Sequence, residues 1–153
     1  MKKIALGSKL PVFSLKDQDN KIINSHDFIG RKNLVIYFYP KDDTPGCTAE
    51  ACSFRDEFED FKTLDAEVIG ISSDSPASHK KFAEKYNLTF RLLSDEDNEV
   101  RKLFRVPTNF LGLLPGRVTY IIDKTGIVQH VFNSQFNARK HVSEAKKILE
   151  SLS

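Results

Sequence analysis

The chain lacks the features that mark membrane, secreted and nucleic-acid-binding proteins. No apolar run approaches the length that spans a membrane. The first seven residues are basic, but the apolar stretch behind the lysines is too short for a secretory signal. Basic and acidic residues number 23 and 21, and the net charge of +2 is too balanced to suggest a nucleic-acid partner. There is also no internal repeat, low-complexity tract or linker.

Cysteine is scarce, since Cys47 and Cys52 are the only two in 153 residues. The missing C-x-x-C motif argues against a general disulfide exchanger. Two cysteines without nearby histidines are weak evidence for zinc, and Asp42-Asp43 suits a turn before a helix as well as a magnesium site. We therefore expect no metal and no cofactor. No metal-ligand spacing is formed by the four histidines, His26, His79, His130 and His141.

What the chain does contain is typical of one globular domain. Its apolar content is 40% and its charged content is 29%, and 153 residues can enclose a sizeable core. We expect a single domain over residues 1–153, located in the cytoplasm. In that compartment structural disulfides are rare, and redox-active ones are the usual exception.

Strand and helix patterns alternate along the chain. Strands are predicted over residues 11–15, 21–24, 33–39, 67–72, 90–93, 118–123 and 127–132. Helices are predicted over residues 45–64, 76–86, 98–104 and 138–152, with a short turn over 25–28 that Ser25 could cap. Strand–helix alternation implies an α/β sandwich, and the hairpin predicted from the strands over 118–123 and 127–132 makes its sheet mixed.

Cys47 is predicted to lie in the first turn of a helix that directly follows a buried strand. The strand stops at Pro40, Thr44 can cap the helix, and Pro45 suits its first turn. Unpaired N–H groups and the helix dipole favour negative charge at that position. Cys47 therefore tends toward the thiolate, which is the nucleophilic form of cysteine.

The spacing of the two cysteines is informative in itself. On an unbroken helix, residues five apart have Cα atoms roughly 8.6 Å apart, whereas a disulfide needs about 4.4–6.8 Å. Either Cys47 and Cys52 never bond, or bonding requires the first turns of the helix to unwind. The second option describes a switch between reduced and oxidised states, and a static structural disulfide is the poorer interpretation.

Residues 39–48 resemble the P-x-x-x-T-x-x-C signature of peroxiredoxins, and Cys52 five residues on resembles their bacterioferritin-comigratory, or Q-type, subfamily. The likeness covers nearly the whole chain and includes residues 67–72, 93–95, 114–123 and 133–136. It implies a thioredoxin-like fold, with a mixed central sheet flanked by helices. It also implies a monomer that reduces hydroperoxides and is recharged by thioredoxin or a similar dithiol protein.

The resemblance assigns roles to five residues. Cys47 would attack the peroxide and become a sulfenic acid, which Cys52 would then convert to a disulfide. Thr44 would hydrogen-bond the peroxide, Arg117 would support the thiolate and hold the peroxide oxygens, and Pro40 would limit water access. Taken singly, Thr44 is a helix cap, Pro40 a strand terminator and Arg117 a surface charge, so only the combined pattern indicates a site.

Several alternatives stay open. Glu50 matches the family pattern, but an acidic residue suits any helix start, and we leave it out of the candidate site. The apolar segment 106–114 could line an entrance, pack in the core or contact another subunit. The chain could also be a redox sensor that passes oxidation to a partner, or a non-enzymatic thioredoxin-like binding module. The combination of Thr44, Cys47 and Arg117 argues against the binding module.

Overall fold

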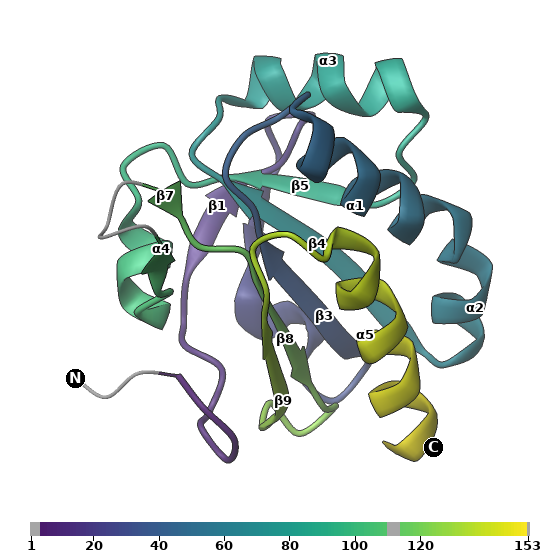
Figure 1. The fold of residues 1–153 in the computed structure, drawn as a ribbon. Helices are drawn as coiled ribbons and strands as arrows, with labels where there is room; N and C mark the ends of the chain where they lie inside the picture. Colours follow the sequence, from purple (N-terminus) through teal and green to yellow (C-terminus); the bar gives the residue numbers. More distant parts are fainter. Residues whose placement is uncertain (1–3, 110–113, 153) are drawn as a thin grey trace.

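The computed structural model describes residues 4–109 and 114–152, and it has one large sheet with helices on both faces (Figure 1). The sheet has the strand order β2-β1-β5-β4-β3-β8-β9. Its strands are β1 (Ser14–Lys16), β2 (Ile22–Asn24), β3 (Asn33–Phe38), β4 (Ala66–Ser72), β5 (Arg91–Ser94), β8 (Val118–Ile122) and β9 (Val128–Asn133). A separate strand pair consists of β6 (Thr108–Asn109) and β7 (Leu114–Pro115).

The helices are α1 (Pro45–Asp56), α2 (Phe58–Thr63), α3 (Pro76–Tyr86), α4 (Glu99–Phe104) and α5 (Ala138–Leu152), with a 3-10 helix η1 (Ser25–Phe28). Strands β3, β4 and β5 run parallel, while β1, β8 and β9 pair antiparallel with their neighbours. The predicted mixed sheet flanked by helices is therefore confirmed.

The core has two halves, one on each face of the sheet. Along β3, Val35 and Tyr37 point to the half that contains side chains from α1, α2, α3 and α5. Leu34, Ile36 and Phe38 point to the half closed by α4 and the amino-terminal segment. Because β3 is central and covered on both sides, its sequence is a continuous apolar run rather than an alternating one.

Most predicted elements match, and the differences are local. Helices α3 and α5 have the predicted bounds, and Ser75 caps α3 by accepting from the Ser78 N–H at 3.1 Å. The single helix predicted over 45–64 is wrong, because the chain leaves helical geometry at Glu57 and forms α1 and α2. Ser25 does not cap η1, since its buried hydroxyl bonds the backbone of Phe13 and Pro11 instead. The short strands β6 and β7 were not predicted.

The pairing of β3 with β8 determines where the two halves of the candidate site meet. The strands are antiparallel, and Phe38 at the end of β3 lies opposite Val118 at the start of β8. The chain that leaves β3 toward Cys47 therefore passes the residue that precedes β8, which is Arg117. Within residues 4–109 and 114–152, no helix is long and apolar enough to cross a membrane.

Candidate active site

Cys47 lies in the first turn of α1, as predicted, and its side chain is buried. Thr44 occupies the N-cap position, where its carbonyl accepts the Thr48 N–H at 2.8 Å. The hydroxyl of Thr44 makes no capping bond and donates instead to the carbonyl of Lys41 at 2.9 Å. The predicted position of Thr44 is thus correct, but its predicted capping bond is not.

Arg117 makes direct contact with Cys47, although the two residues are 70 positions apart in the sequence. Its Nη2 lies 3.4 Å from Cys47 Sγ, its Nη1 donates to Glu50 Oε1 at 2.7 Å, and its Nε donates to the Gln135 carbonyl at 3.1 Å. The guanidinium side chain is only 5% exposed. Three acceptors, two on α1 and one after β9, therefore hold the guanidinium in one orientation.

The charge of Arg117 is preserved despite its burial. Burial alone would lower the pKa of Arg117, but the adjacent Glu50 and Cys47 outweigh it, and that pKa is raised. A guanidinium that stays charged beside Sγ favours the thiolate form of Cys47.

Two glycines allow the close approach of the chain around Arg117. A Cβ at Gly46 would lie 3.0 Å from Arg117 Nη2, and the hydrogen bonds to that guanidinium leave it little room to move. A Cβ at Gly116 would lie 1.8 Å from the carbonyl oxygen of Pro107, which no backbone could accommodate. Gly116 therefore requires glycine, and a side chain at Gly46 would displace the Arg117 guanidinium.

Pro40 lies between β3 and the turn before α1, and it is half-buried. The carbonyl of Tyr39, directly before it, accepts from Arg101 Nη2 at 3.2 Å. Arg101 Nη1 also donates at 3.0 Å to the carbonyl of Gly116. Arg101 on α4 therefore ties the segment that carries Pro40 to the segment that carries Arg117.

Cys52 lies on the same unbroken helix as Cys47, but on a different side. It is half-buried and lines a groove of about 630 Å³ between α1 and α5. Both cysteines are free thiols. The structure therefore brings Cys47 together with Arg117 and leaves Cys52 outside that contact, as the spacing of five residues predicts.

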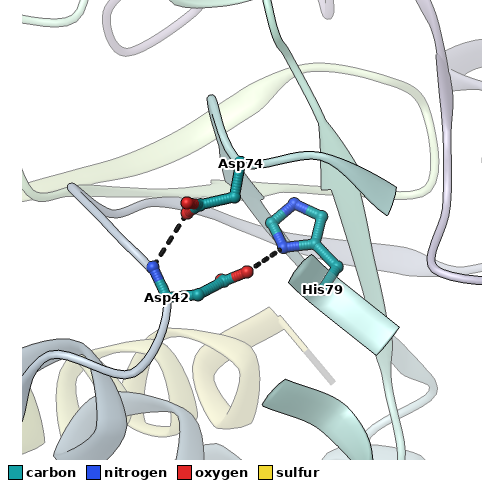
Figure 2. Close-up of side chains that lie close together, drawn as sticks. All are labelled: Asp42, Asp74 and His79. Atoms are coloured by element: carbon teal, nitrogen blue, oxygen red, sulfur yellow. Dashed lines mark hydrogen bonds and ion pairs between the residues drawn. The ribbon is translucent and has the colours of Figure 1, made fainter. Parts of the chain in front are cut away.

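Asp42, Asp74 and His79 form a cluster whose side chains approach one another beside the turn that precedes α1 (Figure 2). One ligand atom from each lies within 4.8 Å of the others, as a metal site would need. These atoms already have partners, however. His79 Nδ1 lies 2.7 Å from Asp42 Oδ2, and His79 Nε2 lies 3.0 Å from the Leu93 carbonyl oxygen. Asp74 Oδ2 accepts hydrogen bonds from the Ser72 hydroxyl and from the Asp42 N–H. These hydrogen bonds hold the turn that carries Thr44, and this structural role explains the cluster.

Sequence reasoning missed three residues of this region. Glu50 is fully buried and pairs with Arg117, so leaving it out of the candidate site was wrong. Its match to the family pattern was the available signal. Arg101 and His141 carried no such signal, because their contacts depend on how α4 and α5 pack. Residues 110–113 of the apolar segment 106–114, including Phe110, lie outside the described residues.

Comparisons with known proteins agree with this arrangement. A family model described as the AhpC/TSA family matches residues 6–131. Peroxiredoxin Q of Oryza sativa subsp. japonica, named as chloroplastic, is 55% identical over 150 residues, covering 98% of this chain and 69% of the rice protein. The chloroplastic peroxiredoxin Q of Triticum aestivum gives the same identity and coverage.

Solved structures show the same relationship. Peroxidoxin BcpB from Mycobacterium tuberculosis superimposes with a TM-score of 0.90 at 34% identity, covering 98% of this chain and 99% of its own. PrxQ from Xylella fastidiosa gives a TM-score of 0.90 at 28% identity, covering 99% of both chains. Each is a thioredoxin-like peroxiredoxin structure, so the predicted fold is confirmed.

The chain belongs to the AhpC/TSA family and is a peroxiredoxin, a thiol-dependent peroxidase. Within that family it is of the Q type, also called bacterioferritin-comigratory, and the resemblance read from the sequence is confirmed. The expected cytoplasmic location is not confirmed, since these plant relatives are named as chloroplastic.

Proposed function

We propose that Cys47 is the thiolate that attacks the hydroperoxide. The observation that carries this proposal is the 3.4 Å contact between Cys47 Sγ and Arg117 Nη2, in a region closed to solvent. Sulfur bonds to the terminal peroxide oxygen as the O–O bond breaks, giving a sulfenic acid and an alkoxide or hydroxide. The leaving oxygen then takes up a proton to become an alcohol or water.

Arg117, Thr44 and Pro40 would assist that step. The guanidinium of Arg117 can face both the sulfur and the peroxide oxygens, where negative charge develops. Thr44 has its hydroxyl proton committed to the Lys41 carbonyl, so its oxygen can accept the O–H of the hydroperoxide. Pro40 is half-buried next to the turn and presents no N–H, which suits a role in limiting water access.

Cys52 would then resolve the sulfenic acid. Its thiol attacks Cys47 sulfur, a disulfide forms, and water leaves. Thioredoxin or another dithiol protein returns both residues to thiols and becomes a disulfide itself. Because all these residues belong to one chain, a monomer is sufficient for the cycle. Recharging requires a reducing compartment, and the cytoplasm is one that fits.

A coupled assay tests the proposal. Peroxide consumption is followed with thioredoxin, thioredoxin reductase and NADPH, comparing hydrogen peroxide, a small alkyl hydroperoxide and a lipid hydroperoxide. Multiple turnovers are expected. A redox sensor, the other candidate, would be oxidised once per chain and then stop although reduced thioredoxin is present.

Replacing Arg117 with alanine should slow oxidation of Cys47 by roughly a hundredfold or more, the scale of losing a charge-stabilising donor. The fraction of Cys47 present as thiolate should fall as well, because the adjacent positive charge is gone. Stopped-flow oxidation and ultraviolet absorbance of the thiolate measure the two effects.

The control must account for Glu50, because the alanine variant leaves the buried Glu50 Oε1 without its donor, at a cost of about 1–3 kcal/mol. In an Arg117→Gln, Glu50→Gln double variant neither side chain can carry a charge, so the loss of the Arg117 charge can be separated from a loss of folding. Arg105→Ala, an exposed arginine, should change neither quantity. If oxidation rate and thiolate fraction both survive in Arg117→Ala, Arg117 does not belong to the site.

Replacing Arg101 with methionine should slow single-turnover oxidation by roughly tenfold, because hydrogen bonds from a charged group contribute about 1.5–3 kcal/mol. Methionine keeps most of the side-chain length but releases the two carbonyls that precede Pro40 and Arg117. Lys102→Met, on the exposed side of the same helix, is the matched control. Equal rates in the two variants would show that Arg101 does not position the site.

Oxidation should open the start of α1. Cys47 and Cys52 lie on one continuous helix, so their Cα atoms are roughly 8.6 Å apart and must approach before a disulfide can form. Amide hydrogen exchange across residues 45–61 should therefore be about tenfold faster or more in the disulfide form, equivalent to ~1.4 kcal/mol of lost protection. Helix α3 serves as the internal control. If the disulfide is confirmed but amide protection over residues 45–61 is the same in the reduced and disulfide forms, the predicted opening of α1 is wrong.

A further inference from the structure

Glu50 is fully buried, yet only one of its two carboxyl oxygens is satisfied. Oε1 accepts from Arg117 Nη1 at 2.7 Å. Oε2 has no hydrogen-bond donor among the described residues, and His141 Nδ1 lies 3.6 Å from it. A buried carboxylate oxygen without a donor is costly, so this oxygen calls for an explanation.

The protonation state of His141 follows from its own hydrogen bonds. Nε2 lies 2.7 Å from the Ser134 carbonyl, which can only accept, so the ring proton must be on Nε2. Nδ1 then carries a lone pair, which accepts the Thr119 hydroxyl at 2.7 Å. Burial lowers the pKa of His141 to about 4, which keeps the ring neutral. Glu50 Oε2 therefore faces another acceptor and not a donor.

The charges around Cys47 also bear on whether Glu50 is ionised or protonated. Cys47, Glu50 and the Arg117 side chain are at most 5% exposed. A thiolate and a carboxylate together with the Arg117 guanidinium would leave a net negative charge in this enclosed region, because Arg101, the other cation that interacts with Cys47, also faces the carboxylate of Asp95. An uncompensated buried charge costs several kcal/mol in proteins, and such groups commonly keep a proton instead. One proton on Glu50 makes the sum of the three charges zero.

We propose that Glu50 is protonated on Oε2 when Cys47 is a thiolate, so that the positive charge of Arg117 is balanced by the sulfur and not by a carboxylate. The carbonyl-like Oε1 still accepts from Arg117, and a protonated Oε2 no longer places a negative charge beside the lone pair of His141 Nδ1, which stays with the Thr119 hydroxyl. Glu50 is in this account a positioning residue whose neutral form keeps a second negative charge away from Cys47.

The other groups around Glu50 agree with this assignment. Burial raises the pKa of Glu50 to about 8, although Arg117 opposes the rise. The titratable groups that face it are Cys47 on its own helix, Arg117 before β8, His141 on α5 and Tyr37 on β3. Burial and the charges of Glu50 and Cys47 raise the pKa of Tyr37, so its hydroxyl stays neutral. Arg117 is thus the only cation among these groups.

The proposal, which rests on the proposed role of Cys47, has a consequence for the reaction. Attack on the peroxide converts the thiolate to a neutral sulfenic acid and leaves an alkoxide that needs one proton. With the thiolate gone, Arg117 holds the carboxylate form of Glu50 instead. Glu50 then releases its proton as the alkoxide takes one up, and the site stays neutral before and after the step.

Carbon NMR of protein labelled at the glutamate carboxyl carbon tests the proposal, with Glu50→Gln identifying the Glu50 signal. In the reduced wild type, Glu50 should remain protonated at neutral pH and titrate near pH 8, while exposed glutamates titrate in acid. In Cys47→Ser, the proton affinity of Glu50 should fall by roughly tenfold or more, because a nearby like charge has been removed. An ionised Glu50 at neutral pH in the reduced wild type would overturn the proposal.

Two further measurements keep the test decisive. If Glu50→Gln does not fold, the infrared carbonyl stretch of a protonated carboxylic acid in the wild type reports the same state without that variant. The Cys47→Ser comparison separates the two proposals. If Glu50 is protonated but its pKa does not change in Cys47→Ser, the proposed coupling between Glu50 and Cys47 is wrong. If Cys47→Ser retains peroxidase activity, the proposed role of Cys47 is wrong.

Discussion

Cys47→Ser should reduce peroxide consumption to the uncatalysed background while the protein stays folded. Serine keeps the size of the side chain, and its oxygen can accept from Arg117 Nη2 where the sulfur now does. It cannot become an anion near neutral pH, so the nucleophile is lost although the surroundings remain. The free energy of unfolding should change by less than about 2 kcal/mol, as for most conservative substitutions.

The measurement is the coupled assay together with thermal unfolding of the same preparation. Ser53→Ala, a change of one oxygen elsewhere on α1, serves as the matched control and should keep full turnover. Retention of most peroxidase activity in Cys47→Ser would move the chemistry to another residue, and the assignments of Arg117 and Thr44 would then be lost as well.

Cys52→Ser should separate the first oxidation from the catalytic cycle. Cys52 lies in the groove between α1 and α5 and makes no contact with Arg117 in the described structure, so the first oxidation should be largely intact. Turnover with thioredoxin should stop, because the sulfenic acid has no resolving thiol. Stopped-flow mixing with one equivalent of hydroperoxide, followed by the coupled assay, measures both steps.

The oxidation state of Cys47 provides the control for this second variant. In Cys52→Ser, mass spectrometry after peroxide treatment should find Cys47 as sulfenic acid at low peroxide and as more oxidised acids at high peroxide. Wild-type protein treated in the same way should be protected by its disulfide. Undiminished turnover with thioredoxin in Cys52→Ser would show that another thiol, or the reductant itself, resolves Cys47.

Much of the fold follows from local sequence patterns. The apolar run of β3, the Ser75-Pro76 start of α3 and the amphipathic face of α5 each indicate their element directly. The division between α1 and α2 at Glu57 could not be anticipated, since no proline or glycine marks it. The two-residue strands β6 and β7 are too short to produce a periodic pattern.

The candidate site shows the same limit more sharply. Cys47 could be placed from its own neighbours, because a strand, a proline and a helix start identify it. The contact with Arg117 depends on the register of β3 against β8, which only tertiary structure supplies. Glu50 and His141 come from α1 and α5, and their proximity depends on how those helices pack. An acidic residue at a helix start has an ordinary explanation, and burial is what separates Glu50 from that explanation.

The central claim is that one chain carries a complete cycle through Cys47 and Cys52. Peptide mapping of reduced wild-type protein, quenched after one equivalent of hydroperoxide, tests it most directly. The account predicts a disulfide between Cys47 and Cys52 within a single chain, formed in nearly every molecule and removed by reduced thioredoxin. Two free thiols after the peroxide has been consumed, or disulfides found only between chains, would contradict it.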